Sequence, residues 1–184
     1  GLPLGIVLAA AWVRYFPLAR IVQSIRDNLD FLSSAARDAT PQHRSLRAVF
    51  NHSWNLLFEE EQRVFRQLAV FRGGWEEEAA ERVVGASIQS LVSLVDKSLL
   101  RREATGRFEI HEVLRQYATE KLDALPEEQE AIRHRHAAYY LDLAQLAKTE
   151  LQGNEQVRWL ARLEQEHDNL RAVLQWARET GEAE

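Results

Sequence analysis

The chain has 184 residues, of which 46% are apolar and 28% are charged, and its formal net charge is −5. This length allows one compact domain or two small ones, and the absence of cysteine excludes disulfides, thiol catalysis and cysteine-ligated zinc. No segment has the strong basic excess typical of nucleic-acid-binding proteins, since residues 44–124 carry twelve Lys and Arg against thirteen Asp and Glu.

Residues 1–34 predict two helices. The apolar run at residues 2–13 is shorter than the roughly 20 residues that a membrane-spanning helix needs, so we read it as a buried helix. Pro3 stands in the first turn, where a missing N–H costs little. A second helical pattern follows Pro17, and the polar residues 35–45 are predicted to be a linker. A chain that opens in the middle of a pattern, without Met, is expected to be part of a longer protein.

Residues 46–125 predict short helices followed by a β-hairpin. The helical patterns cover residues 46–57, 59–71, 75–84 and 87–100. The period then changes around a turn at Gly106, and a further helix starts at His111 and ends before Pro126. This order is the outline of a winged helix, in which the hairpin is the wing and residues 87–100 take the place of the recognition helix.

Beyond Pro126 the pattern is helical and acidic. It predicts one long helix over residues 126–151 and either one or two helices over residues 155–179. Apolar and aromatic residues at packing positions, among them Tyr140 and Leu141, favour antiparallel pairs similar to tetratricopeptide repeats. The predicted fold is mainly α, with four parts: an N-terminal helical remnant (1–34), a linker (35–45), a winged-helix domain with a small β-hairpin wing (46–125) and the start of a tetratricopeptide-like helical region (126–184).

No motif for catalysis or metal binding is present. The sequence has no H-E-x-x-H zinc motif, no G-x-S-x-G elbow and no G-x-x-x-x-G-K-[ST] phosphate loop, so we expect no enzyme activity, no catalytic residue and no metal site. In the RHRH run at residues 133–136, His134 and His136 are two positions apart, and on a helix such positions point to different faces. We therefore interpret the run as a solvated charged face.

The winged-helix outline makes DNA binding an alternative function. The predicted recognition helix offers only Gln89 and Lys97 to bases or phosphates, and the hairpin carries Arg101, Arg102 and Arg107 with two glutamates close by. Because phosphate neutralisation normally dominates DNA affinity, we do not expect DNA as a partner. A DNA-binding transcription-regulator module and a helical protein-interaction scaffold stay as alternatives.

Four stretches in a fixed order resemble the middle of a bacterial STAND signalling NTPase of the NB-ARC or AP-ATPase type. They are GLPLGIVLAAAWVR, SLRAVFNHSWNLLFEEEQRVFRQLAVFRGGW, LVSLVDKSLL followed by RFEIHEVLRQYA, and RHAAYYLDLA with EHDNLRAVLQWA. They resemble, in turn, the family's GLPL helix, the opening of its winged helix, the region of its M-H-D motif and the start of its tetratricopeptide-like sensor.

The resemblance implies a nucleotide contact at two residues. In the family, the proline of GLPL lies against the adenine, and the histidine of M-H-D contacts the β-phosphate of ADP. Pro3 and His111 inherit these roles. The motif here reads Ile110-His111-Glu112, and the longer Glu112 leaves the role of the family's Asp open. A structural histidine is the alternative at His111.

The resemblance also implies a regulatory, non-catalytic fragment. With the phosphate loop missing, the fragment is expected to hold no cofactor itself, while the parent protein, an ATPase, binds ADP or ATP with Mg²⁺. The expected partners are its own NTPase domain, the tetratricopeptide-like repeats, other copies on activation and an unidentified sensor ligand. The winged helix would hold an autoinhibited state as a nucleotide switch. We expect a cytoplasmic protein with no membrane partner.

Overall fold

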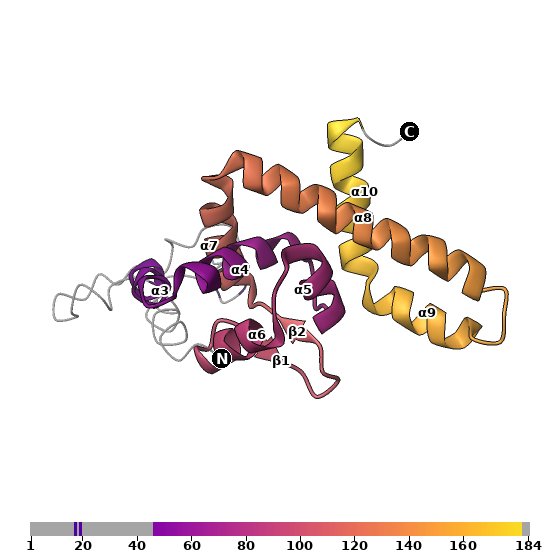
Figure 1. Cartoon of the computed structure of the whole chain (residues 1–184), viewed down its shortest axis with the longest axis horizontal. Coiled ribbons are helices and arrows are strands. Elements are labelled where there is room, and N and C mark those ends of the chain that lie inside the picture. Colours follow the sequence, from indigo (N-terminus) through magenta and orange to yellow (C-terminus); the bar gives the residue numbers. More distant parts are fainter. Residues whose placement is uncertain (1–16, 18, 20–45, 182–184) are drawn as a thin grey trace.

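The computed structural model describes residues 46–181, together with residues 17 and 19. The predicted helical remnant and linker, with Pro3, otherwise lie outside the described residues. The described chain is mainly helical with one small hairpin, which confirms the predicted fold class (Figure 1). The elements are α3 (Leu46–Asn55), α4 (Glu59–Gln67), η3 (Leu68–Val70), α5 (Glu77–Val84), α6 (Ile88–Asp96), β1 (Arg101–Arg102), β2 (Phe108–Glu109), α7 (Glu112–Asp123), α8 (Pro126–Glu150), α9 (Gln156–Gln165) and α10 (His167–Thr180).

The predicted wing is the antiparallel hairpin of β1 and β2, which follows α6 directly. Its register pairs Arg101 with Glu109 and Arg102 with Phe108. Gly106 has a φ of 89° in the connecting turn, a conformation that glycine adopts without steric cost. The turn residue was therefore predicted correctly from sequence.

Trp75 extends the wing by one further strand position. Its N–H and C=O both bond to Phe108, at 2.9 and 2.8 Å. The sequence pattern assigned Trp75 to the start of a helix, and that assignment is wrong, because α5 begins only at Glu77. The indole is fully buried and stacks on Phe71, with 5.0 Å between ring centroids, so packing decides its conformation.

The predicted recognition helix is shorter than its sequence pattern. Ser87 begins α6 as its N-cap, and its hydroxyl accepts the N–H of Ser90 at 3.1 Å. The helix ends at Asp96 instead of continuing to residue 100, because Ser98 adopts a φ of 59°. Leucines beyond that turn are buried in the core without being helical.

Replacing Ser87 with alanine is expected to lower the free energy of unfolding by about 1 kcal/mol, because the N–H of Ser90 then loses its acceptor. Ser87→Gly is expected to cost only a few tenths of a kcal/mol, since glycine suits the N-cap conformation. Urea unfolding followed by circular dichroism measures both values. Equal losses in the two variants would show that Ser87 does not act as a cap.

The long helix predicted after Pro126 is present as α8, but its buried face differs from the predicted one. The buried positions include His136, Tyr139 and Tyr140. Leu141, predicted to face the core, is 57% exposed, because the buried stripe follows the contacts of α8 with α5 and α7. The solvated face predicted for RHRH is also wrong at His136, whose side chain is 3% exposed, although His134 is exposed.

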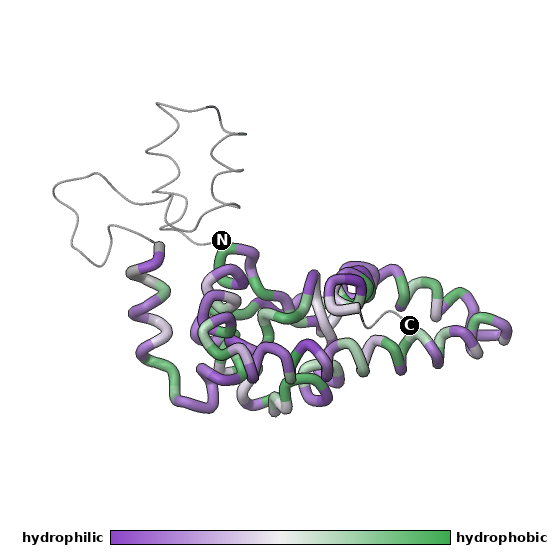
Figure 2. The backbone as a smooth tube through the Cα atoms, turned by 90° about the horizontal axis from the view of Figure 1, so that it is seen from above, coloured by the Kyte–Doolittle hydropathy of each residue, from purple (hydrophilic) through white to green (hydrophobic). Residues whose placement is uncertain are grey.

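Residues 155–179 form two helices, α9 and α10, which settles the alternative left open by the sequence. Helix α8 packs against α5, α7 and η3, and also against α9 and α10. Figures 1 and 2 show the α8–α9 pair extending away from the winged-helix part as an antiparallel arm. One continuous core includes side chains from α4 to α8, so α8 belongs to the packing of the winged helix. The division between residues 46–125 and 126–184 stays a prediction.

Candidate nucleic-acid interface

The face that would contact DNA is formed by α6 and the wing. Figure 1 shows these elements together at the end of the molecule opposite α8 and α10. The exposed side chains of α6 and its C-cap are Gln89, Val92, Asp96 and Lys97. Gln89 is the amide that could read a base edge. Lys97 forms an ion pair with the carboxylate of Glu61 on α4, which reduces the charge it offers to a phosphate.

Two of the three hairpin arginines remain at the surface. Arg101 is exposed and forms an ion pair with Glu109, its partner across the hairpin. The guanidinium of Arg102 lies over the ring of Phe108, 5.6 Å from its centroid, and is exposed on its other side. Such surface pairs are weak and can be exchanged for phosphate contacts. The cationic footprint of this face is therefore small.

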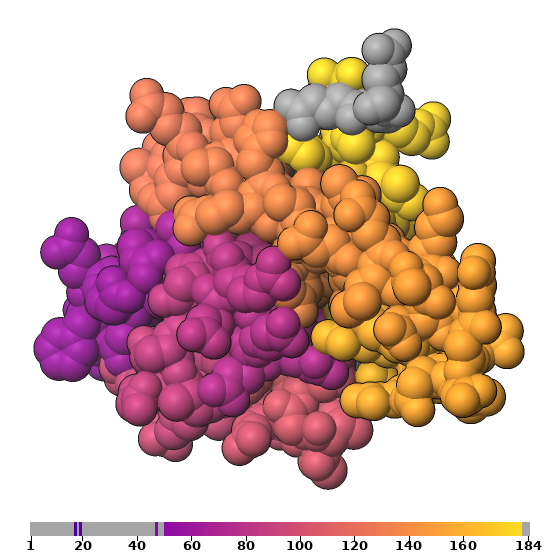
Figure 3. Space-filling view, turned by 45° about the vertical axis from the view of Figure 1, so that its right-hand side comes forward, coloured from indigo at the N-terminus to yellow at the C-terminus, as the bar shows by residue number. Residues whose placement is uncertain are grey.

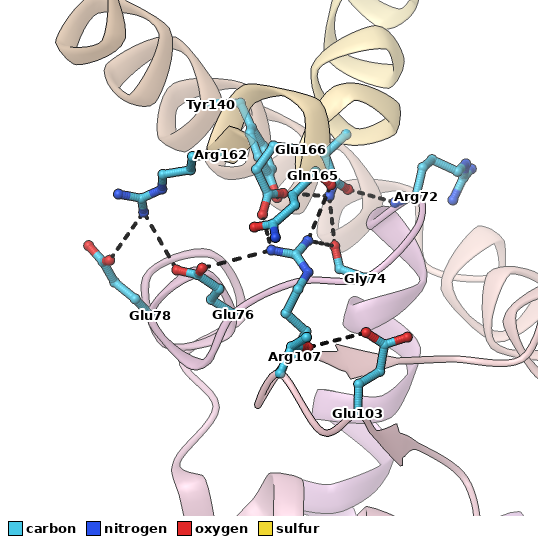
Figure 4. Close-up of polar contacts among 12 residues, drawn as sticks. Arg72, Gly74, Glu76, Glu78, Glu103, Arg107, Tyr140, Arg162, Gln165 and Glu166 are labelled. Atoms are coloured by element: carbon cyan, nitrogen blue, oxygen red, sulfur yellow. Dashed lines mark hydrogen bonds and ion pairs between the residues drawn. The ribbon is translucent and has the colours of Figure 1, made fainter. Parts of the chain in front are cut away.

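Arg107, the third hairpin arginine, cannot contact DNA. Its side chain is buried and forms an ion pair with the buried carboxylate of Glu166, at the junction of α9 and α10. Figure 4 shows Arg107 pointing from the wing toward that junction. Nη2 of Arg107 also donates to the carbonyl oxygen of Gly74 at 2.6 Å. A Cβ at Gly74 would lie 3.2 Å from the Phe108 carbonyl oxygen, so a larger residue there would crowd this contact.

Glu166 is the centre of a buried polar network. The hydroxyl of Tyr140 donates to it at 2.8 Å, and the amide of Asn169 donates to it at 3.0 Å. Asn169 also donates to the carbonyl oxygen of Gly74 at 3.1 Å, and its own oxygen accepts the backbone N–H of Arg72 at 2.7 Å. Residues 72–74, the wing, α8 and the α9–α10 junction therefore meet in one polar network, although they are distant in sequence.

The electrostatics of this network favour a charged pair. Burial lowers the pKa of the Arg107 guanidinium, but the hydrogen bond and the charge of Glu166 outweigh it and raise that pKa above its usual value. Burial, together with the carboxylate of Glu166, raises the pKa of Tyr140, so its hydroxyl stays a donor. Arg162 on α9 adds a second link, 3.6 Å from Glu76 and 3.7 Å from Glu78 at the start of α5. The wing is thus fixed against α8, α9 and α10.

His111 lies where the sequence analysis placed it, at the entrance of α7. It is the N-cap residue, and its Nδ1 accepts the N–H of Val113 at 3.4 Å. The side chain is exposed beside a hollow of about 300 Å³ that Arg101 and Glu109 also line. These contacts are those of a helix-capping histidine. Pro3 lies outside the described residues, so its pairing with His111 at a nucleotide stays untested.

Glu112 is engaged within its own helix. Burial raises the pKa of its carboxyl, but the hydrogen bonds of Arg115 and Gln116 outweigh burial and lower it overall. Arg115 contacts both carboxylate oxygens, at 2.6 and 2.7 Å. Glu112 therefore forms an ion pair with Arg115 that stabilises the first turn of α7.

Within residues 46–181, no group of three or more His, Asp or Glu side chains is arranged to hold a metal ion. None of the helices described has both the length and the apolar character required to cross a bilayer.

Comparison with known proteins finds relatives that are named as transcriptional regulators. Proteins called "Putative HTH-type transcriptional regulator" in Mycobacterium bovis and Mycobacterium tuberculosis are 38% identical over 191 residues, an alignment that covers 98% of this chain. An uncharacterized protein of Mycobacterium tuberculosis is 32% identical over 134 residues, covering 66% of this chain and 34% of the relative. No family model and no solved structure matches.

The chain spans about a fifth of the length of the named regulators, since the alignment covers 21% of each. Their names contradict the resemblance to a STAND NTPase fragment. The predicted partnership with an NTPase domain and the predicted nucleotide switch were therefore wrong. The prediction that DNA is not a partner is also contradicted by these names. The motifs misled because short amphipathic patterns in a fixed order are shared by many winged helices that precede paired helices.

Proposed function

We propose that this chain is a non-catalytic winged-helix segment of a transcription regulator, and that it contacts duplex DNA through α6 and the wing. The relatives named as regulators align with nearly the whole chain, which supports a regulatory role. The observation that carries the DNA contact is the position of α6 beside two exposed arginines, on a face left open by α8 and α10 (Figure 1).

In this proposal α6 enters the major groove and the wing contacts the backbone. Gln89, in the first turn of α6, is placed to meet base edges, where an amide can bond to adenine. Lys97, Arg101 and Arg102 supply the phosphate contacts. Three such contacts predict weak binding with a slope of about −2.7 in a plot of log affinity against log salt concentration.

The test is fluorescence anisotropy with a labelled duplex of about 30 base pairs in roughly 50 to 200 mM KCl. Affinity is expected to fall about 40-fold across that range. The double variant Arg101→Ala/Arg102→Ala is expected to reduce the slope to about −1, because two phosphate contacts are lost.

The matched control is Arg171→Ala/Arg178→Ala, which removes the same charge from exposed positions on α10. It should bind as the parent chain does. Equal weakening in both double variants would show that net charge, and not the α6–wing face, is responsible for binding.

A second candidate is a protein-binding segment of the same regulator. It is favoured by large apolar side chains exposed on α8, α9 and α10, such as Leu141, Val157 and Leu174, which are 57%, 81% and 67% exposed. Figure 3 shows the α8–α9 arm forming a large part of one face of the molecule. Absence of any salt-dependent duplex binding at about 50 mM KCl would favour this candidate over the first.

A further inference from the structure

A cavity of about 160 Å³ lies where α10 meets the winged-helix part of the molecule. Its walls come from η3, α7, α8 and α10, and it is separate from the α6–wing face. An engineered protein cavity of about 150 Å³ accommodates benzene, so a space of this size admits a small organic molecule.

Buried polar atoms in the wall of this cavity have no hydrogen-bond partner. Nε2 of His136 and the hydroxyl of Thr119 are both without one within the part of the chain that the structure describes, and both residues line the cavity. The His136 side chain is 3% exposed. A buried donor or acceptor left unpaired costs about 1–3 kcal/mol, so such atoms are commonly paired with a bound molecule or water.

Two arginine side chains also line the cavity. Arg72 and Arg133 line it, and neither forms an ion pair among residues 46–181. Nη1 of Arg72 donates only to the carbonyl oxygens of Ala69 and Phe71, at 2.7 and 3.1 Å. Burial lowers the pKa of Arg72 to about 10, with smaller lowering effects from Arg115 and Arg133 and an opposing effect from the carboxylate of Glu112.

The remaining walls are apolar, apart from Gln129, Gln175 and Glu179, whose polar groups already form hydrogen bonds. Leu122, Val173 and Trp176 face the space from α7 and α10. The carboxylate of Glu179 also borders it and accepts the side-chain amide of Gln175 at 2.9 Å. The cavity wall therefore combines cationic and apolar side chains.

We propose that this cavity binds a small organic carboxylate, with its anionic group between Arg72 and Arg133 and its apolar body against Leu122, Val173 and Trp176. Nε2 of His136 and the hydroxyl of Thr119 complete the polar contacts. A bound carboxylate would connect α10 to η3 and α7 directly. This site is independent of the DNA contact proposed above, because it shares no residue with α6 or the wing.

The probe is benzoate, which has an aromatic body and one carboxylate, titrated into the full chain at pH 7 by isothermal calorimetry. Benzoate is expected to bind in a one-to-one ratio. Benzyl alcohol has the same ring without the charge, and inorganic phosphate has the charge without the ring. Both are expected to bind at least tenfold more weakly. Equal binding of benzyl alcohol would overturn the anion site, and equal binding of phosphate would overturn the apolar one.

Arg133→Gln removes one of the two cations and is expected to lower the affinity for benzoate at least tenfold. Arg135→Gln is the matched control, because Arg135 lies on the same helix, carries the same charge and does not line the cavity. It should leave benzoate affinity unchanged. Equal effects of the two variants would overturn the proposal.

A measurement on the unaltered chain keeps the test independent of folding of the variants. In proton–nitrogen NMR spectra, benzoate is expected to shift the indole N–H of Trp176, with smaller changes at Trp54 on α3, which lies outside the cavity. No shift at Trp176 at saturating benzoate would place any bound probe elsewhere and overturn the site.

Discussion

Replacing Arg107 with methionine is expected to lower the free energy of unfolding by about 3–5 kcal/mol, because it leaves the buried carboxylate of Glu166 without its counter-charge. Methionine retains most of the aliphatic length of the side chain, so the loss reports the charge more than the packing. The guanidinium also bonds to Gly74, and that carbonyl oxygen would keep only Asn169 as a donor. Urea unfolding at pH 7 measures the change.

Arg101→Met is the matched control, because Arg101 is on the same hairpin and also pairs with a glutamate, but its side chain is 71% exposed. Its loss is expected to stay below about 1 kcal/mol. A similarly small loss for Arg107→Met would mean that water reaches the Glu166 carboxylate, and the network would then not fix the wing.

The double variant Arg107→Met/Glu166→Gln distinguishes an unpaired charge from a missing side chain. Glutamine removes the negative charge and keeps an oxygen that can accept from Tyr140 and Asn169. The double variant is therefore expected to be more stable than Arg107→Met alone, by about 1–3 kcal/mol. A double variant less stable than Arg107→Met would show that charge is not the cause of the loss.

The local structure of this chain is largely predictable from its sequence, because short-range chemistry determines it. Ser87 caps a helix because its hydroxyl reaches the N–H three residues on, and Pro126 starts α8 because it lacks an N–H that would be unpaired there. Gly106 marks the hairpin turn through its positive φ. Each of these signals lies within a few residues of its effect.

The network at Glu166 could not be predicted, because its members are far apart in the sequence. Arg107 and Glu166 are 59 positions apart, and each looks like one more surface charge in an ordinary helical or hairpin pattern. The same holds for His136, which ends the charged RHRH run in the sequence and yet points inward against Phe71 and Tyr140. The pairing of α8 with α5 and α7 decides which charged residues are buried, and no local pattern records that pairing.

The main functional prediction, a STAND NTPase fragment, was wrong, whereas the names of the relatives favour the alternative of a DNA-binding transcription-regulator module. His111 was singled out because an imidazole at a helix entrance fits a phosphate contact, but the same position serves as an ordinary N-cap, and the two uses give the same local pattern. The deciding evidence came from relatives that align with nearly the entire chain. The structure limits the number of cationic side chains that could contact DNA. Arg107 is buried, and Lys97, Arg101 and Arg102 are the cations exposed on α6, its C-cap and the wing.

Stability is expected to fall by about 2 kcal/mol between pH 6.5 and pH 5, because His136 is buried in its neutral form. Burial lowers the pKa of His136 to about 4, with an opposing effect from the side chain of Asn169 and a smaller lowering by Arg72. In the unfolded chain the pKa is about 6.5, so below that pH the unfolded state binds a proton that the folded state rejects. The stabilising effect is fully present at neutral pH and is lost as the pH falls toward 4.

This pH window separates His136 from the paired carboxylates. Glu61, Glu112 and Glu128 have pKa values below their usual 4.5, so the stability that they contribute is lost only as the pH falls below about that value. His136→Phe is expected to keep the packing against Phe71 and to remove the dependence between pH 6.5 and 5. Urea unfolding at several pH values measures both slopes.

The matched control is His134→Gln, two residues earlier on α8, where the imidazole is exposed. It should retain the slope of the parent chain, because the buried His136 is unchanged in this variant. A flat stability profile for the parent chain would mean that the cavity beside His136 stabilises the charged imidazole. Such a cavity would contain a bound negative charge or water, which also bears on its ability to hold a carboxylate.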